Sequence, residues 1–437
     1  MNTSTVNTEL LSFIDASPTA FHVVRSVTDL LGARGYTELL ESDIWHLKPG
    51  GCYYVTRNLS SIIAFTVPAD GLPSGFMIGA AHTDSPSFKI KESAESESGG
   101  YTHLNVERYG GMLCATWFDR PLSAAGKVML STDNGIRPCL VNLRRPLFMI
   151  PSLAIHMNRK ANDGVTYNPA SDMQPIAGSV AAKGGLRRAV AALIGEKEER
   201  ILSYDLFLYP TESGTVWGTE EEYISSPRLD DLQCAFALTK GFLEVDTPKA
   251  TPVLFLADNE EVGSTTKQGA ASTFLADVLL RLVESLGGSA SDYRRAVAQS
   301  FMVSADNAHA VHPNHPEYAD PAHRPMMNGG IVIKHNAAQR YTTDAASAAI
   351  FSAICRRAEV PIQHFTNRAD LAGGSTLGNI ANTQVSLNTV DIGLPQLAMH
   401  SCYETAGAKD TAYLIDAMKV FFVSALTEVT AGEYRLE

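Results

Sequence analysis

The candidates for chemistry in this sequence follow three apolar stretches, each of which ends in His, Asp or Glu. His82 and Asp84 follow GFMIGAA, Glu260 and Glu261 follow VLFLADN, and Asp306 follows FMVSA. Imidazole and carboxylate groups bind divalent metal ions, and a nearby carboxylate can take a proton from a water that the ion activates. Three such endings in one chain favour a single metal site over separate structural roles.

The pair His82 and Asp84 is separated by one residue at the end of an apolar strand. Alternate residues of a strand share a face, so both side chains can point into one site. This spacing lets the imidazole bind an ion while the carboxylate orients the ring. Taken alone, an H-x-D pair is more often an ordinary polar strand end.

Glu260 and Glu261 are adjacent carboxylates at the end of a strongly apolar strand. They would repel each other and be costly to bury unless a cation or hydrogen bonds compensate. A metal ion is the simplest compensation, with a solvated acidic loop as the alternative. Successive residues point in different directions, so Glu261 could bind the ion while Glu260 faces the activated water, or the reverse.

Two further groups carry the same residue types. Asp230 and Asp231 open an apparent helix in SPRLDDL, where a carboxylate is also a common helix cap. His309 stands close behind Asp306, and His400 follows an apolar segment with Glu404 four residues on. Any single His of this kind is more often structural than a metal ligand. The whole set together favours the metal site.

Other catalytic signatures fit poorly. The chain contains no G-x-x-x-x-G-K-[ST], no H-E-x-x-H and no G-x-G-x-x-G after a strand. The segment GGSTLG carries Leu377 where the G-x-S-x-G nucleophile elbow of serine hydrolases needs Gly. These absences argue against P-loop NTPases, single-zinc helical proteases, common dinucleotide enzymes and serine hydrolases of that type.

Helices and short apolar strands alternate from about residue 228, which predicts a layered α/β domain with a largely parallel sheet. The upstream strand that ends in His82 has the same character, whereas residues 95–227 alternate apolar and polar residues between Gly and Pro, as antiparallel strands do. We therefore expect a discontinuous α/β domain, residues 1–94 and 228–437, interrupted by a β-rich insertion at 95–227. Open α/β sheets bind ligands beyond the carboxyl ends of their strands, where the acidic clusters lie.

Composition narrows the class of protein. The chain has 437 residues with 45% hydrophobic and 19% charged residues, as expected of a globular protein. Its 35 Lys and Arg against 47 Asp and Glu give a net charge of −12, which argues against nucleic acid as a partner. No secretory signal or membrane span is expected. The six dispersed cysteines are typical of a reduced, cytoplasmic protein.

The ordered motifs extend the argument to a family. GAAHTDSPSFKIK, SPRLDDL, DNEEVGS, DNAHAVHPN, IKHNAAQRY, GGSTLG and HSCYETAG together resemble the aspartyl aminopeptidases, dinuclear zinc exopeptidases. The resemblance covers nearly the whole chain. It implies an α/β peptidase domain with an inserted β-rich dimerisation and assembly domain, and a homo-oligomer that is a tetrahedral dodecamer.

Residue by residue, the resemblance implies a complete metal site. The implied metal ligands are His82, Asp230, Glu261, Asp306 and His400, with Asp230 bridging two ions. Glu260 is then the general base, and Asp84 is the partner that orients His82. The implied cofactor is two Zn²⁺ per subunit, although Mn²⁺ or Co²⁺ fits the same donors.

The resemblance also implies the substrate, small peptides with an unblocked amino-terminal Asp or Glu. Lys334 in the I-K-x-N-x-x-Q-R-Y segment and His309 are candidates to bind the acidic side chain, and His156 matches a residue that reaches a neighbouring subunit's active site. An isolated subunit would then be inactive. The main alternative is a related dinuclear aminopeptidase or deacylase with a different first-residue preference.

Two other classes are less well supported. Metallophosphoesterases usually carry D-x-H and G-N-H-[DE] signatures, whereas this chain has H-x-D and D-N-E-E. A scaffold or carrier that kept the fold without the activity would be expected to lack at least one ligand or Glu260, and all of them are present.

Overall fold

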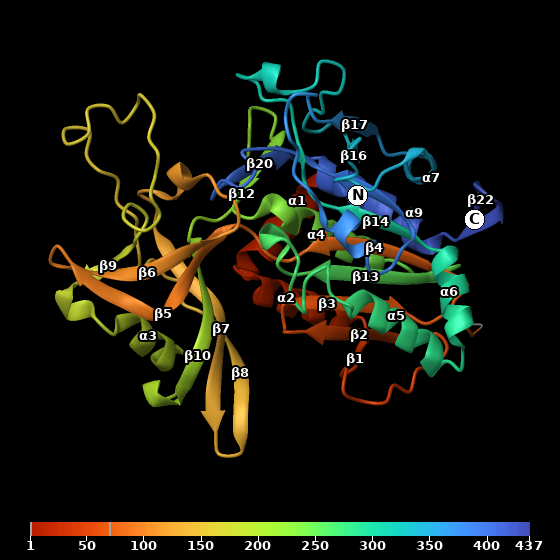
Figure 1. The fold of residues 1–437 in the computed structure, drawn as a ribbon, viewed down its shortest axis with the longest axis horizontal. Helices are drawn as coiled ribbons and strands as arrows, with labels where there is room; N and C mark the ends of the chain where they lie inside the picture. Colours follow the sequence, from red (N-terminus) through yellow and green to blue (C-terminus); the bar gives the residue numbers. More distant parts are fainter. Residues whose placement is uncertain (1, 70) are drawn as a thin grey trace.

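The computed structural model describes residues 2–69 and 71–437. Figure 1 shows two masses side by side, one built of strands covered by helices and one dominated by long strands. The first contains a nine-stranded sheet and the second a six-stranded sheet, with smaller sheets of five and two strands. This arrangement confirms the layered α/β class.

The nine-stranded sheet has a parallel centre and mixed flanks. Strand β4 lies between β13 and β14 and is parallel to both, and β14 is parallel to β18. In sheet order the strands are β1 (Thr37–Glu38), β2 (Cys52–Arg57), β3 (Ser61–Thr66), β13 (Thr251–Ala257), β4 (Phe76–His82), β14 (Phe301–Ala305), β18 (Asn388–Gly393), β16 (Ile331–His335) and β17 (Ile362–Thr366). The central strands match the apolar stretches from which they were predicted.

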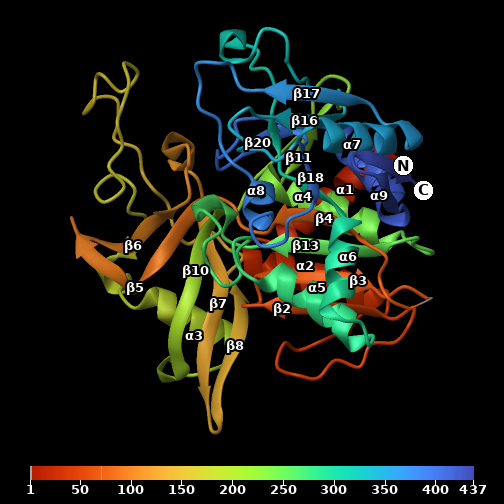
Figure 2. The same cartoon turned by 45° about the vertical axis from the view of Figure 1, so that its right-hand side comes forward.

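Helices cover both faces of this sheet, as Figure 2 shows from a second direction. Side chains of α1 (Thr3–Ala16), α2 (Ala20–Ala33), α4 (Leu229–Leu243), α7 (Ala345–Arg357) and α9 (Asp410–Val423) share one apolar core with one face of the sheet. Side chains of α5 (Phe274–Ser285), α6 (Ala290–Ala298) and α8 (Leu377–Ala381) share a second core with the other face.

Strand β4 shows why its sequence is apolar up to the final His82. All seven of its residues are buried, because the strand lies inside the sheet with helices on both sides. Met77 and Ala81 belong to one core and Ile78 and Ala80 to the other. Alternation of side chains along the strand thus supplies both cores from one segment.

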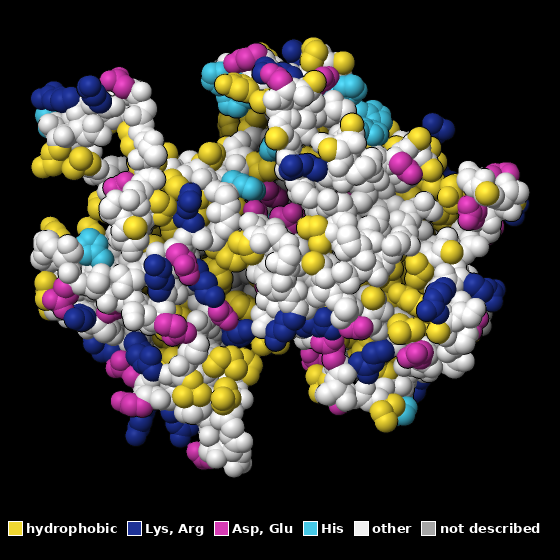
Figure 3. All heavy atoms as spheres, in the orientation of Figure 1, with side chains coloured by type: hydrophobic (Ala, Val, Ile, Leu, Met, Phe, Trp, Pro, Cys, Tyr) yellow, Lys and Arg dark blue, Asp and Glu magenta, His cyan; other side chains and the backbone are white. Residues whose placement is uncertain are grey.

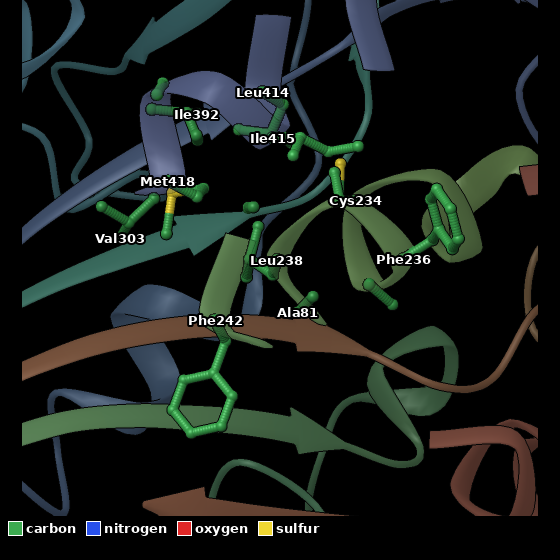
Figure 4. Packing of buried hydrophobic residues seen from close by; sticks show 14 of the residues in the cluster. Ala81, Cys234, Phe236, Leu238, Phe242, Val303, Ile392, Leu414, Ile415 and Met418 are labelled. Atoms are coloured by element: carbon green, nitrogen blue, oxygen red, sulfur yellow. The ribbon is translucent and has the colours of Figure 1, made fainter. Parts of the chain in front are cut away.

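The core beneath α4 and α9 is tightly packed (Figure 4). Phe242 of α4 meets Phe422 of α9 edge to face, with ring centroids 5.4 Å apart. Gly79 of β4 leaves room for this contact, since a Cβ there would lie 2.6 Å from the Phe422 ring. Such packing fixes the strand that carries His82.

The six-stranded sheet is antiparallel and has its own apolar core. In sheet order its strands are β8 (Gly135–Asn142), β7 (Leu122–Thr132), β10 (Ile201–Pro210), β5 (Ser87–Ser98), β6 (Tyr101–Tyr109) and β9 (Ile176–Ser179), and α3 (Gly185–Ile194) packs against it. The first of these strands in the sequence, β5, begins at Ser87, eight residues before the predicted start of the insertion at residue 95. Division of the chain at 95 and 227, and the role of this part in assembly, remain predictions.

The remaining strands form two small sheets. A five-stranded sheet contains β11 (Thr215–Trp217), β12 (Tyr223–Ser226), β20 (Glu404–Gly407), β19 (Pro395–Leu397) and β15 (Ala308–His309), in that order. Strands β21 (Leu426–Thr430) and β22 (Glu433–Leu436) pair with each other. The pairing of β12 with β20 brings the segment before Asp230 beside the segment after His400.

Two sequence expectations concern the chain as a whole. All six cysteines are free thiols. Among the described residues, no helix has both the length and the apolar character that crossing a membrane requires.

Candidate metal centre

The predicted site residues meet at one edge of the nine-stranded sheet. Because β13, β4 and β14 are parallel, their carboxyl ends lie together, with Ala257 of β13 directly opposite His82 of β4. Glu260 and Glu261 lie in a short 3₁₀ helix just after β13, and Asp306 follows β14. Figure 3 shows acidic and His side chains together in a hollow near the middle of the visible face.

Asp230 stands between two imidazoles. Its Oδ1 lies 3.5 Å from Nε2 of His82, and its Oδ2 lies 3.4 Å from Nε2 of His400. The Nδ1 of His82 is 3.0 Å from the backbone carbonyl oxygen of Asp84. Since a carbonyl oxygen only accepts, Nδ1 carries the proton and Nε2 is left with a lone pair that faces Asp230.

The remaining carboxylates complete two groups around these imidazoles. Glu261 Oε2 lies 3.3 Å from His400 Nε2. Ligand atoms of His82, Asp230 and Glu261 lie within 4.8 Å of one another, and so do those of His82, Glu260 and Asp306. All five predicted ligands and Glu260 are therefore brought together. Since both Glu260 and Glu261 lie within reach of a metal position, the division of roles between them remains a prediction.

Buried oxygen atoms without partners show that these residues fit a cation. Asp230 Oδ1, Asp231 Oδ1 and Glu261 Oε1 are buried and accept no hydrogen bond in the described structure. Burial raises the pKa of Glu260 to about 8, and the neighbouring carboxylates of Asp306 and Asp84 add to the rise. So many buried acidic groups cannot all be ionised without positive charge, which a divalent ion supplies.

Asp84 connects His82 to the two glutamates. Its Oδ1 lies 3.4 Å from His82 Nδ1 and accepts a hydrogen bond of 3.1 Å from the backbone N–H of Glu260. Its Oδ2 accepts one of 3.2 Å from the backbone N–H of Glu261. The predicted orienting role of Asp84 therefore extends to the turn that carries Glu260 and Glu261.

The start of α4 is shaped by the site and not by helix capping. Asp230 and Asp231 both have non-helical backbone angles, and the peptide bond between them is cis. Asp231 Oδ2 accepts a hydrogen bond of 3.1 Å from the backbone N–H of His82. The helix-cap alternative therefore does not hold for either side chain, because Asp230 faces the imidazoles and Asp231 holds the end of β4.

The two candidate substrate residues lie beside Asp306. Lys334 is only 3% exposed, and its Nζ donates to Asp306 Oδ1 at 3.3 Å and to the backbone oxygen of Asn307 at 2.8 Å. Burial opposes its charge, but Asp306 and other nearby acidic groups hold the pKa of Lys334 above its ordinary value. His309 is exposed, and its ring packs edge-on against Phe365 at 6.0 Å.

His156 is not part of this cluster. It lies exposed in the loop of residues 151–175, which stands apart from the nine-stranded sheet in Figures 1 and 2 (yellow). Its neighbours Leu153, Ile155 and Met157 are 61%, 45% and 77% exposed. The described chain thus does not bring His156 to its own metal residues.

Sequence reasoning assigned no role to two residues that hold the site. Glu404 is buried and accepts hydrogen bonds from the backbone N–H groups of Asp230 and His400, at 2.9 and 2.7 Å. Tyr109 donates from its hydroxyl to Asp84 Oδ2 at 2.6 Å. A signal existed for Glu404, four residues after His400, whereas Tyr109 is one tyrosine in an ordinary alternating strand.

Comparisons with known proteins place this geometry in a family. The family model described as aminopeptidase I zinc metalloprotease (M18) matches residues 13–422. The chain belongs to the M18 aminopeptidase family. This confirms the resemblance to the aspartyl aminopeptidase family and a zinc-dependent aminopeptidase activity.

Individual M18 relatives are similar over nearly the whole chain. The probable M18 family aminopeptidase 2 of Clostridium novyi is 46% identical over 422 residues, 95% of this chain and 98% of that protein. The cryo-EM structure of the Ape4 and Nbr1 complex has a TM-score of 0.93 and 36% identity, covering 96% of this chain and 86% of that one. The S. cerevisiae mApe1 dodecamer has a TM-score of 0.84 and 27% identity, covering 97% of each chain.

Proposed function

We propose that this M18 aminopeptidase binds two zinc ions and removes unblocked amino-terminal Asp or Glu from small peptides. The observation that carries the two-ion proposal is the placement of Asp230, whose two oxygens face different imidazoles. His82 and Asp306 complete one set of donors, and Glu261 and His400 complete the other. Three protein donors per ion leave open positions, as a catalytic zinc site requires.

In this proposal, residues of the chain transfer the protons that hydrolysis requires and hold the general base in position. When bound, divalent ions of this kind acidify a water and polarise the scissile carbonyl. Glu260 is the general base in this proposal: its carboxylate takes the proton from water and returns it to the leaving amine. Asp84 fixes the backbone of Glu260, which supports this role by limiting where the carboxylate can move.

The preference for an acidic first residue rests on positive charge near Asp306. Lys334 is held charged there, and His309 lies exposed on the short strand after Asp306. The positive potential of Lys334 would favour an Asp or Glu side chain over a neutral one. Loss of hydration and the nearby Lys334 charge lower the pKa of His309, so His309 would act there as a hydrogen-bonding imidazole. The resemblance to aspartyl aminopeptidases points the same way.

A specific observation favours the alternative first-residue preference. The Lys334 ammonium already donates to Asp306 and to the backbone of Asn307, and it is almost fully buried. If those bonds persist when substrate is bound, the pocket would present less charge and accept neutral first residues. A related dinuclear aminopeptidase with another preference is therefore the second candidate.

We also propose a cytoplasmic homododecamer in which His156 acts in a neighbouring subunit. Similarity to the mApe1 dodecamer supports the assembly. The exposed apolar side chains around His156 support a buried contact for the loop, because such side chains gain free energy when another surface covers them.

The test of the function is dipeptide hydrolysis. Asp-Ala, Glu-Ala and Leu-Ala are compared by kcat/KM, first as purified, then after a chelator, and then after zinc is restored. We expect Asp-Ala and Glu-Ala to exceed Leu-Ala by about 100-fold or more, with activity lost to the chelator and regained with zinc. Equal rates for the three peptides would refute the acidic preference, and activity without metal would refute the zinc mechanism.

Metal analysis of the same samples tests the stoichiometry. Two zinc ions per subunit are expected in active protein, and one in Asp306→Asn if Asp306 serves only one ion. Native mass measurement tests the dodecamer independently of activity.

A further inference from the structure

The metal centre is touched by a segment that belongs to the other large sheet. Tyr109 is the last residue of β6 in the six-stranded sheet, and its ring packs edge to face on Phe207 of β10, with centroids 5.4 Å apart. From this anchor its hydroxyl reaches Asp84 Oδ2 at 2.6 Å. A side chain of one sheet thus completes the hydrogen bonds of a site built on the other.

The direction of these hydrogen bonds is fixed by the surrounding network. Asn259 Oδ1 accepts from Thr266 Oγ1 at 2.7 Å and from Gln268 Nε2 at 2.8 Å, so the other end of that amide is the donor. Asn259 Nδ2 donates to the Tyr109 hydroxyl oxygen at 2.7 Å. The hydroxyl proton is therefore left for Asp84, which accepts it as a carboxylate.

The oxygen that Tyr109 binds has a second task. Asp84 Oδ2 also accepts from the backbone N–H of Glu261, and its Oδ1 faces His82 and Glu260. A carboxylate turns as one rigid plane. The hydrogen bond from Tyr109 to Oδ2 therefore also fixes the position of Oδ1 relative to His82 and Glu260.

The residues after Tyr109 continue along the site. Gly110 has φ of +78°, and a Cβ there would lie 3.1 Å from Cβ of Glu261, so the chain passes close against that side chain. Leu113 donates its backbone N–H to the carbonyl oxygen of His400 at 3.0 Å. The segment of residues 109–113 therefore contacts both sides of the metal centre.

We propose that Tyr109 is a positioning residue of the metal centre, whose hydroxyl fixes the Asp84 carboxylate and through it His82 and the Glu260–Glu261 turn. The six-stranded sheet then helps to position the metal-binding residues, in addition to any role in assembly. This rests on the proposed function to the extent that His82 and Glu261 bind metal.

The test is zinc affinity in the full-length protein, measured by competition with a chelator. Tyr109→Phe keeps the ring that packs on Phe207 and removes only the hydroxyl. We expect it to weaken zinc binding by about 10- to 100-fold and to lower kcat more than it changes KM. The matched control is Tyr101→Phe, since Tyr101 lies exposed at the other end of the same strand.

A double-mutant cycle separates positioning from general packing. If Tyr109 acts through Asp84, Tyr109→Phe should weaken zinc binding much less in an Asp84→Asn background than in the wild type. Additive losses, or a Tyr109→Phe protein that binds zinc like the wild type, would overturn the proposal. Zinc affinity needs no substrate, so a wild type that binds zinc but cleaves no peptide would refute the proposed function and leave this test intact.

Thermal unfolding and native mass accompany each variant. If Tyr109→Phe unfolds or dissociates, Asn259→Ser takes its place in the cycle, because it removes the amide that orients the same hydroxyl from the opposite side. A loss of zinc affinity in Asn259→Ser that is much smaller in an Asp84→Asn background supports the proposal, and unchanged zinc affinity in Asn259→Ser contradicts it.

Discussion

The backbone N–H of Asp230 donates a hydrogen bond of 2.9 Å to the side chain of Glu404. The other oxygen of Glu404 accepts from the backbone N–H of His400 at 2.7 Å. One buried carboxylate therefore fixes the backbone of two candidate ligands that are 170 residues apart in sequence. Burial and the nearby Asp230 raise the pKa of Glu404 to about 8, so these bonds are formed at an electrostatic cost that bound cations would reduce.

Glu404→Gln should weaken zinc binding without unfolding the protein. A glutamine offers one acceptor oxygen, so one of the two backbone N–H groups would face an NH₂ group instead. A buried unpaired donor costs about 1–3 kcal/mol. Chelator competition measures the loss, with exposed Glu244→Gln as the control; equal zinc affinity in the two variants would contradict the role of Glu404.

Glu260→Gln and Glu261→Gln form a matched pair that separates base from ligand. Glu260→Gln should retain two zinc ions and lose about 100-fold or more in kcat, as expected for a general base. Glu261→Gln should lose zinc, because its Oε2 lies 3.3 Å from the His400 imidazole. Metal content and kcat are measured on the same samples, and the opposite pattern would exchange the two roles.

Removal of zinc should lower the stability of the folded chain. Ligand bound only by the folded state adds about 4 kcal/mol at a thousandfold excess over its Kd. The unfolding temperature should therefore fall with a chelator and recover with zinc. In Asp230→Asn, where the shared carboxylate has lost its charge, the unfolding temperature should respond much less to zinc; an undiminished response would show that Asp230 does not bind the ions.

His22 should make the fold sensitive to acid. Burial, followed by the positive charges of Arg228 and Arg144, lowers the pKa of His22 from 6.5 to about 4. Between these values the unfolded chain binds a proton that the folded chain does not, so the free energy of unfolding falls as the pH falls through this window. Below about pH 4 this contribution is fully lost.

His22→Gln should therefore lose less stability than the wild type between pH 6.5 and pH 4, by about 1–3 kcal/mol. Denaturant unfolding at several pH values measures the difference, and exposed His46→Gln should follow the wild type. Parallel curves for His22→Gln and the wild type would show that the folded chain does not keep His22 neutral.

Subunit mixing tests the proposed role of His156. His156→Ala should be inactive with normal zinc content, and so should an assembly made only of Glu260→Gln subunits. Mixed assemblies should regain activity, because a site with intact Glu260 can receive His156 from a Glu260→Gln neighbour. Activity of His156→Ala alone, or no recovery on mixing after confirmed subunit exchange, would contradict a role in the neighbouring subunit.

The strands and the ligands could be predicted because both leave local marks. Strand β4 is apolar from Phe76 to Ala81 since it is buried on both faces, and it ends in a buried polar residue, His82. Acidic residues directly after buried strands are costly to bury without a cation, so their presence after β13 and β14 predicted a metal site.

Contacts between distant segments left no such mark. Tyr109 meets Asp84 only because the six-stranded sheet packs beside the nine-stranded one, and nothing in its own strand distinguishes it from Tyr101. Lys334 could be placed near the site, but its pairing with Asp306 depends on β16 lying beside β18, which in turn lies beside β14. The order of strands in the sheet was likewise outside the reach of the sequence.

Strand β4 pairs with β13 and β14, which are both synthesised more than 160 residues after it. During translation, residues 76–82 leave the ribosome without either neighbour, and His400, which completes the cluster, emerges later still. Under the proposed function, a nascent or prematurely terminated chain that stops short of His400 would lack a ligand and would not cleave peptides around it. Proteolytic activity would then appear only after residue 400 has been synthesised, when strand β4 can also pair with β13 and β14.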